Sequence, residues 1–247
     1  MPTLTTIATD DELIPMYPIE IPRHDLYAGI HKALRHFMLD TLMRVGCLET
    51  RDAAETGAVL GQVEALLAQC GGHLRHENDF IHPALEDCRP GSAARVAADH
   101  VDHVEHIASL RTDVRRLRAA PPEMRAAEAL RLYRHLALFV AENFQHMHHE
   151  ETVHNATLWA HYTDDELGAL HGRLVASLAP QEMFDAARWM IPAMNPSERA
   201  ALLNDMRDNA PAPAFAALVA HVRPHLDATA WSRLAPEIGY APAAEPA

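Results

Sequence analysis

The segment HMHHEETVHNATLW at residues 146–159 repeats the histidine and glutamate spacing of HLRHENDFIHPALE at residues 73–86. Each segment opens with a histidine that is followed four residues later by a glutamate, giving His73 with Glu77 and His146 with Glu150. Residues four apart share one face of an α-helix, because each residue advances the helix by about 100°. We therefore predict two helices that each present an imidazole and a carboxylate in the same direction, as a pair of metal ligands.

A lone histidine precedes each pair at nearly the same distance. His31 lies 42 residues before His73, and His103 lies 43 residues before His146. A single helical histidine is usually an ordinary surface or core residue, but a buried glutamate is rare unless it is paired or binds metal. Two pairs and two lone histidines would form a cage of nitrogen and carboxylate ligands, which suits iron better than a thiolate site does.

Composition predicts an all-α protein. The 247 residues are 49% hydrophobic, enough for a buried core, and include only 10 glycines and 6% aromatic residues. Alanine, leucine, glutamate and arginine are abundant, and these side chains lose little rotamer freedom in a helix.

Charge and terminal sequence argue against several classes of partner. A net charge of −13 disfavours a surface that binds nucleic acid. The first twenty residues have no signal-peptide pattern, and no stretch approaches the roughly 18 apolar residues that span a bilayer, so we expect a cytoplasmic protein without membrane contact. The three cysteines lack CxxC spacing, which indicates neither a disulfide framework nor a zinc knuckle.

Four long helices are expected, joined by short connections in an up-down-up-down four-helix bundle. The first starts near His24 or Asp25, and the second follows an N-cap at Asp52. Ser92 is the expected cap of the third helix, which stops before Pro121. The expected ranges are 24–46, 53–85, 93–120 and 123–159.

The third helix offers three competing histidines. His103 lies within about 20° of the apolar line on the helical wheel, whereas His100 and His106 lie about 60° to either side. His103 is therefore the preferred ligand, and His106 is kept as a second ligand from the same helix.

Other histidines near the two motifs receive less specific interpretations. His82 falls opposite His73 on the wheel, and His148 and Glu151 point away from His146, so we expect the latter two to be solvated. The flanking residues that are candidates for hydrogen bonds to the ligands are His76, His149 and His154.

The two segments resemble the hemerythrin-like, or HHE cation-binding, domain family. HLRHENDFIHPALE is similar to the second-helix signature of that family, and HMHHEETVHNATLW is similar to its fourth-helix signature. IHKALR around His31 and DHVDHVEHIASL around His103 and His106 match the weaker first- and third-helix patterns. The resemblance covers residues 24–162.

This resemblance implies a bundle that holds two non-haem iron ions, bridged by carboxylates and an oxygen species. The ligands it implies are His31, His73, Glu77, His103 or His106, His146 and Glu150. The oxygen carriers of the family have His-x-x-x-His on the third helix, but here Ile107 stands four residues after His103. That departure weakens the expectation of reversible oxygen carriage more than the expectation of iron binding.

We expect four regions along the chain: an extended segment at 1–22, the bundle at 23–162, a C-terminal helical extension at 163–240 and a disordered tail at 241–247. Capping boxes at Thr163/Glu166 and Asn195/Glu198 predict short helices in the extension. The extension has three candidate roles: a lid, a homodimer surface or a docking site for a partner protein.

Three classes of function follow. The leading hypothesis is a diiron protein that binds dioxygen, another diatomic ligand or peroxide, for sensing, storage or protection, without turnover of an organic substrate. The second is a diiron oxygenase, oxidase or peroxidase. The Glu-x-x-His spacing of ferritin-like enzymes occurs near the motifs only at Glu151/His154, which weakens this reading. The third is a helical interaction module with zinc or no metal.

Overall fold

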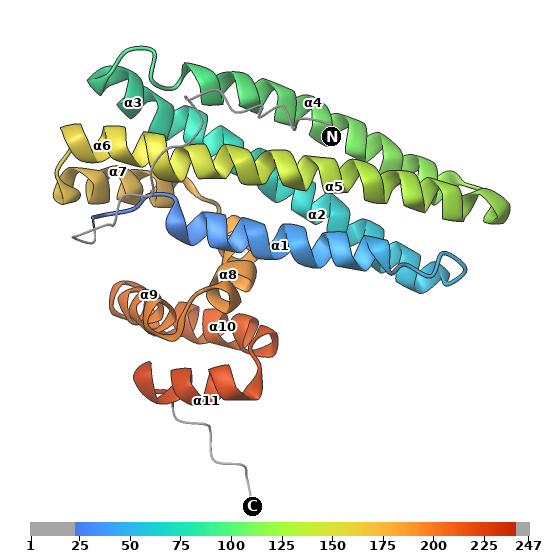
Figure 1. Ribbon diagram of the computed structural model, residues 1–247. Helices are drawn as coiled ribbons and strands as arrows, with labels where there is room; N and C mark the ends of the chain where they lie inside the picture. The colour runs from blue at the N-terminus through green and yellow to red at the C-terminus, as the bar shows by residue number, and fades with distance from the viewer. Residues whose placement is uncertain (1–22, 241–247) are drawn as a thin grey trace, which may run out of the picture.

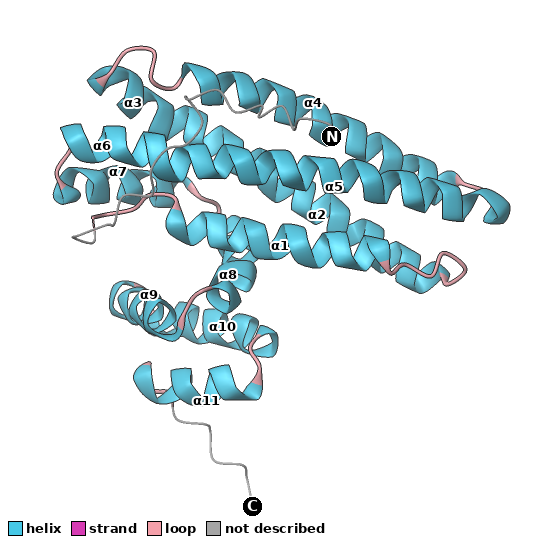
Figure 2. Cartoon of the chain, in the orientation of Figure 1, coloured by secondary structure: helices cyan, strands magenta, loops and turns pink. Residues whose placement is uncertain are grey.

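The computed structural model describes residues 23–240, and that range is helical with no strands (Figure 2). This confirms the all-α prediction for the described part of the chain. The expected extended segment at 1–22 and the expected tail at 241–247 lie outside the described residues. No helix between residues 23 and 240 combines the length and apolar character needed to cross a membrane.

Four long helices lie side by side and enclose the main core (Figure 1). They are α1 (Ala28–Gly46), α2 (Ala53–His76), α4 (Ala94–Ala119) and α5 (Arg125–His149). Helices α1 and α4 each pack against both α2 and α5. Leu66, Leu110 and Leu136 are fully buried between them, because each helix repeats apolar residues at three- and four-residue intervals along one face.

The first two helix starts follow from aspartate side chains. The Asp25 carboxylate accepts hydrogen bonds from the backbone N–H groups of Tyr27 and Ala28, at 2.9 and 3.0 Å, so α1 begins at Ala28 rather than near His24. The Asp52 carboxylate caps α2 as predicted, accepting from the next two free N–H groups of that helix.

The predicted cap of the third helix is wrong. Helix α4 begins at Ala94, and the Ser92 hydroxyl instead donates a hydrogen bond to the carbonyl oxygen of Leu85 at 3.1 Å. Ser92 therefore closes the turn between the second and third long helices, because its side chain adds a second hydrogen bond to a carbonyl that already accepts one from the backbone N–H of Arg89.

Two of the long helices continue through a π-helical turn. Helix α2 passes through η1 (Glu77–Ile81) into α3 (His82–Cys88), and α5 passes through η3 (Glu150–His154) into α6 (Asn155–His161). In each turn a backbone N–H donates to the carbonyl five residues back, from His82 to Glu77 and from Asn155 to Glu150. Each π turn therefore inserts one extra residue into its helix, and the inserted turn begins at the motif glutamate.

The rest of the chain forms short helices, namely α7 (Asp164–Ser177), α8 (Pro180–Ala193), α9 (Pro196–Asn209), α10 (Ala212–Val222) and α11 (Ala228–Glu237), with 3-10 turns η2 (Pro122–Met124) and η4 (Arg223–His225). The capping boxes at Thr163 and Asn195 are present as predicted. Helices α8 to α11 share a second core.

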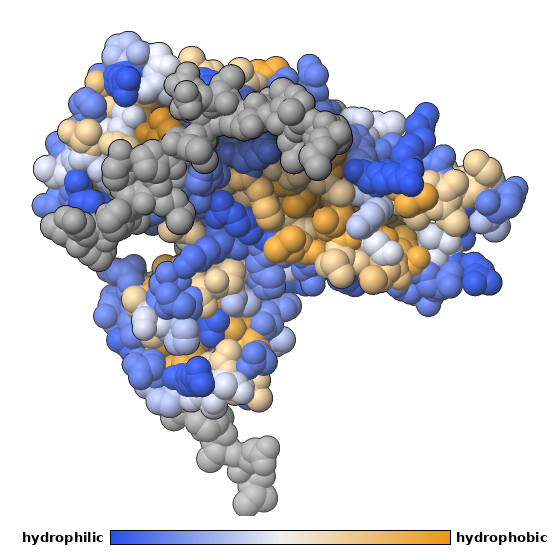
Figure 3. Space-filling view, in the orientation of Figure 1, coloured by the Kyte–Doolittle hydropathy of each residue, from blue (hydrophilic) through white to orange (hydrophobic). Residues whose placement is uncertain are grey.

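Helix α8 joins this second core to the main core. The Trp189 ring stacks on Phe37 of α1, with ring centroids 4.0 Å apart and an angle of 12° between the planes. Figure 3 shows apolar side chains gathered on one face of the molecule. Leu39 and Met43 of α1 and Leu138 of α5 are exposed large hydrophobic residues.

Candidate metal centre

Six side chains from the four long helical segments converge where α2 and α5 enter their π turns. They form two groups of metal-binding type that share both motif glutamates. Within each group, one ligand atom per residue lies within 4.8 Å of the others. The first group is His31, His73, Glu77 and Glu150, and the second is Glu77, His100, His146 and Glu150.

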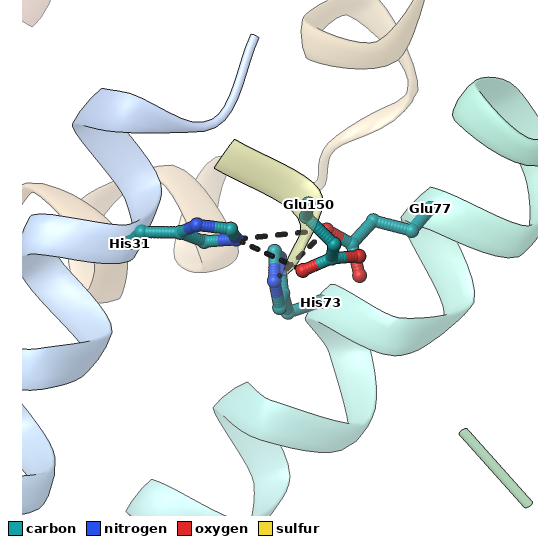
Figure 4. Close-up of side chains that lie close together, drawn as sticks. All are labelled: His31, His73, Glu77 and Glu150. Carbon is teal, nitrogen blue, oxygen red and sulfur yellow. Dashed lines mark ion pairs between the residues drawn. The ribbon is translucent and has the colours of Figure 1, made fainter. Parts of the chain in front are cut away.

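The first group joins α1 to both motif helices (Figure 4). His31 Nε2 lies 3.7 Å from Glu77 Oε1 and 3.4 Å from Glu150 Oε2. His73 Nε2 lies 3.1 Å from Glu77 Oε1, which is the contact predicted by the four-residue spacing. These two imidazoles therefore face the same carboxylate oxygen from different helices.

The second group faces the other oxygen of Glu77 and shares Oε2 of Glu150 with His31. His100 Nε2 lies 3.4 Å from Glu77 Oε2, and His146 Nε2 lies 3.3 Å from Glu150 Oε2. Glu77 thus presents Oε1 to the first group and Oε2 to the second. This is the arrangement of a carboxylate that can bridge two metal ions.

The polar atoms at the centre lack ordinary partners. Both carboxylate oxygens of Glu77 and of Glu150, together with Nε2 of His31 and His73, are buried and have no hydrogen-bond partner among the described residues. A buried polar group without a partner costs about 1–3 kcal/mol, and more if it is charged. Bound cations would satisfy these atoms, so the donor set fits metal.

Two carboxylates this deep repel each other. Glu77 is 3% exposed and Glu150 is fully buried. Burial, reinforced by repulsion from Glu77, raises the pKa of Glu150 well above its usual range. The pKa of Glu77 is lowered instead, because the surrounding imidazoles outweigh its burial. The pair therefore favours a positive charge between its members, either protons or a metal ion.

Two of the imidazoles, those of His73 and His146, are neutral at physiological pH. Burial lowers the pKa of His73 to about 4 and that of His146 to about 2. A neutral imidazole keeps a lone pair free to bind metal. Burial acts on His31 in the same direction, but the hydrogen bond with Glu151 and the negative charge of Glu77 outweigh it and raise the pKa of His31.

Glu151 contacts the nitrogen of His31 that faces away from the two buried carboxylates. The expectation that Glu151 is solvated is therefore wrong. Its Oε1 lies 3.1 Å from His31 Nδ1, and its carboxylate accepts two hydrogen bonds from Arg35, at 2.5 and 2.9 Å. With Nδ1 held by this carboxylate, His31 directs Nε2 toward Glu77 and Glu150. A helical wheel of this segment does not predict the contact, because the contact depends on α1 lying beside Glu151.

The structure places His100, and not His103, in the donor groups. Both side chains are buried, but His103 lies about 4.5 Å further along α4, given a rise of about 1.5 Å per residue. His103 packs its ring against His146, with centroids 4.8 Å apart. His106 lies outside both groups, and its Nδ1 is 2.8 Å from Glu142 Oε2 near the surface.

The π turns bring two further histidines inward. His82 is 7% exposed and His154 is fully buried, and each offers a ligand atom that groups with Glu150. The wheel position of His82 opposite His73 is wrong, because the extra residue of η1 rotates the following side chains back by about 100°.

A cavity of about 710 Å³ reaches the centre from the side of the C-terminal helices. Its walls come from α1, α2, α7 and α8, and they include His73 and Glu77. Small side chains on α2, among them Gly61, Ala65 and Ala68, leave this space unfilled. The cavity gives small molecules a route to the first donor group.

No family model, no curated protein and no solved structure matches the chain.

Proposed function

We propose that this chain is a non-haem diiron protein that binds dioxygen or a related small ligand such as nitric oxide or peroxide. The observation that carries the proposal is the placement of the Glu77 oxygens, with Oε1 facing His31 and His73 and Oε2 facing His100. A carboxylate shared in this way supports a pair of ions rather than a single one. Four imidazoles and two carboxylates are a donor set that suits iron, whereas a structural zinc site usually closes with four ligands.

The proposal includes a hemerythrin-like up-down-up-down arrangement of α1, α2, α4 and α5. Short connections between consecutive long helices support it, since they favour antiparallel neighbours. The motifs at 73–86 and 146–159 support it independently, because both glutamates stand at the first residue of a π turn. Single π turns inside α-helices are often found at functional sites.

The chain contributes binding, orientation and exclusion of water. His31 and His73 would hold one ion and His100 and His146 the other, with Glu77 and Glu150 shared between them. Glu151 and Arg35 orient the His31 ring. The iron pair, when bound, supplies the redox chemistry for binding dioxygen. The leucine-rich core closes one side of the site to water and protons, and the cavity beside His73 and Glu77 leaves another side open to small molecules.

Metal content tests the proposal directly. After reconstitution with Fe²⁺ under anaerobic conditions and removal of weakly bound metal by desalting, the protein should hold about two irons per chain, and Glu77→Ala and Glu150→Ala should each lose that metal. His148→Ala is the matched control, because His148 is exposed on the same helix as His146. Less than half an iron per chain after reconstitution would overturn the proposal.

A diiron oxygenase, oxidase or peroxidase is the second candidate. The cavity of about 710 Å³ beside His73 and Glu77 favours it, because a diatomic ligand needs far less space. Cavities of roughly 300–1,000 Å³ commonly bind small organic molecules. Oxygen uptake by the reduced protein that rises with an added organic substrate would favour this candidate over simple ligand binding.

A further inference from the structure

His82, His154 and Glu150 form a third group of metal-binding type next to the two described above. A ligand atom from each residue lies within 4.8 Å of the other two, and all three residues are buried. The two histidines stand just past the two motif glutamates, five residues after Glu77 and four after Glu150. The π turns bring both to the inside of the bundle.

One nitrogen atom of each ring is buried without a hydrogen-bond partner among the described residues. These atoms are Nε2 of His82 and Nε2 of His154. Buried polar atoms in folded proteins are nearly always paired, so two unpaired nitrogens next to one carboxylate call for a ligand. Their rings lie 6.0 Å apart between centroids, at 89° to each other.

The surroundings orient these histidines as metal ligands are oriented. The Tyr27 hydroxyl lies 3.2 Å from His154 Nδ1, which leaves Nε2 as the free nitrogen of that ring. His82 stacks on His100, with ring centroids 4.8 Å apart and an angle of 21° between the planes. A ligand histidine is commonly held through its second nitrogen, as His154 is here, whereas His82 is held by ring stacking.

We propose that His82, His154 and Glu150 bind a third divalent metal ion, with Fe²⁺ as the favoured ion. Two histidines and one carboxylate are the donor composition of non-haem Fe²⁺ sites that keep open positions. The inference builds on the proposed function, because Glu150 belongs to both sites. With only three protein ligands, one of them shared, the third ion binds more weakly than the dinuclear pair and exchanges first.

Counting ions in the full chain tests this site. The protein saturated with Fe²⁺ under anaerobic conditions should bind three ions, with the third removed first by a competing chelator. The variant His82→Ala/His154→Ala should bind two. His106→Ala/His148→Ala is the matched control, because both histidines lie outside all three donor groups, and it should still bind three.

The outcomes separate this site from the dinuclear centre. Two ions in the wild type that His82→Ala/His154→Ala retains would overturn the third site, whereas two ions of which this variant loses one would support that site and overturn the dinuclear centre. One ion in the wild type that His31→Ala/His73→Ala retains and His82→Ala/His154→Ala loses would support the third site and overturn the dinuclear centre. The single substitution His82→Gln covers the case in which the double variant does not fold, and it should lower the count from three to two.

Discussion

His31 is held between two consecutive glutamates of η3, because its Nδ1 lies 3.1 Å from Glu151 while its Nε2 lies 3.4 Å from Glu150. Neighbouring residues of one helix normally point about 100° apart, so α1 must lie close against the η3 turn for both contacts to form. Glu151 thereby sets the direction of a metal-facing nitrogen without facing the metal site itself.

Substitution of the outer glutamate should weaken metal binding. Glu151→Gln removes the charge that holds His31 Nδ1, and changes of this kind typically cost 10–100-fold in metal affinity. Competition with a coloured chelator measures the affinity, and circular dichroism checks the fold. Glu142→Gln serves as control, since Glu142 lies on the same helix and pairs with His106. Equal affinity in both variants would exclude a role for Glu151 in positioning His31.

The two buried histidines of α4 should differ in their effect on metal content. His100→Ala removes a ring that faces Glu77 Oε2 at 3.4 Å and should lower iron by about one ion per chain. His103→Ala removes a packing ring outside the donor groups and should leave the iron content unchanged. Elemental analysis of both reconstituted variants decides between them. Loss of iron in His103→Ala with unchanged iron in His100→Ala would show that His103 is the ligand.

Bound metal should stabilise the fold by mass action. At a free metal concentration of 100 times Kd, binding to the native state alone contributes about 2.7 kcal/mol. For a chain of this size each kcal/mol raises Tm by about 2–4 °C, so Fe²⁺ should raise Tm by roughly 5–10 °C. Differential scanning calorimetry with and without chelator gives the shift. An unchanged Tm at saturating Fe²⁺ would contradict binding at this buried centre.

Neutralising one carboxylate should stabilise the metal-free fold and weaken metal binding. Glu150→Gln keeps the shape of a fully buried side chain but removes its repulsion with Glu77. We expect the metal-free variant to unfold at the same or a higher urea concentration than metal-free wild type, because binding sites are often held at the expense of stability. Urea titrations followed by circular dichroism test this. A clearly lower midpoint would show that Glu150 stabilises the metal-free fold.

Helix α8 should depend on one aromatic contact with the bundle. Trp189→Ala removes the ring stacked on Phe37, and truncation of a buried aromatic residue costs about 3–5 kcal/mol. The expected result is faster proteolysis within α8 to α11 and a lower unfolding midpoint. Met43→Ala is the control, because Met43 is 65% exposed and its truncation should change stability by less than about 0.5 kcal/mol.

Local spacing in the chain was sufficient for the helices and for the two His-x-x-x-Glu pairs. The i, i+4 relation holds wherever a regular helix forms, and the apolar repeats of α1, α2, α4 and α5 predict such helices without any knowledge of their neighbours. The capping aspartate at Asp52 and the capping boxes at Thr163 and Asn195 were predictable for the same reason.

Packing decided which further side chains meet these pairs. The presence of His100 rather than His103 in the donor groups depends on the position of α4 along its axis relative to α2 and α5. The contact of Glu151 with His31 depends on where α1 lies. His82 turns inward because η1 breaks the constant 100° step that a helical wheel assumes. The tertiary structure determined these relationships because they involve the relative position of several helices, which no single segment encodes.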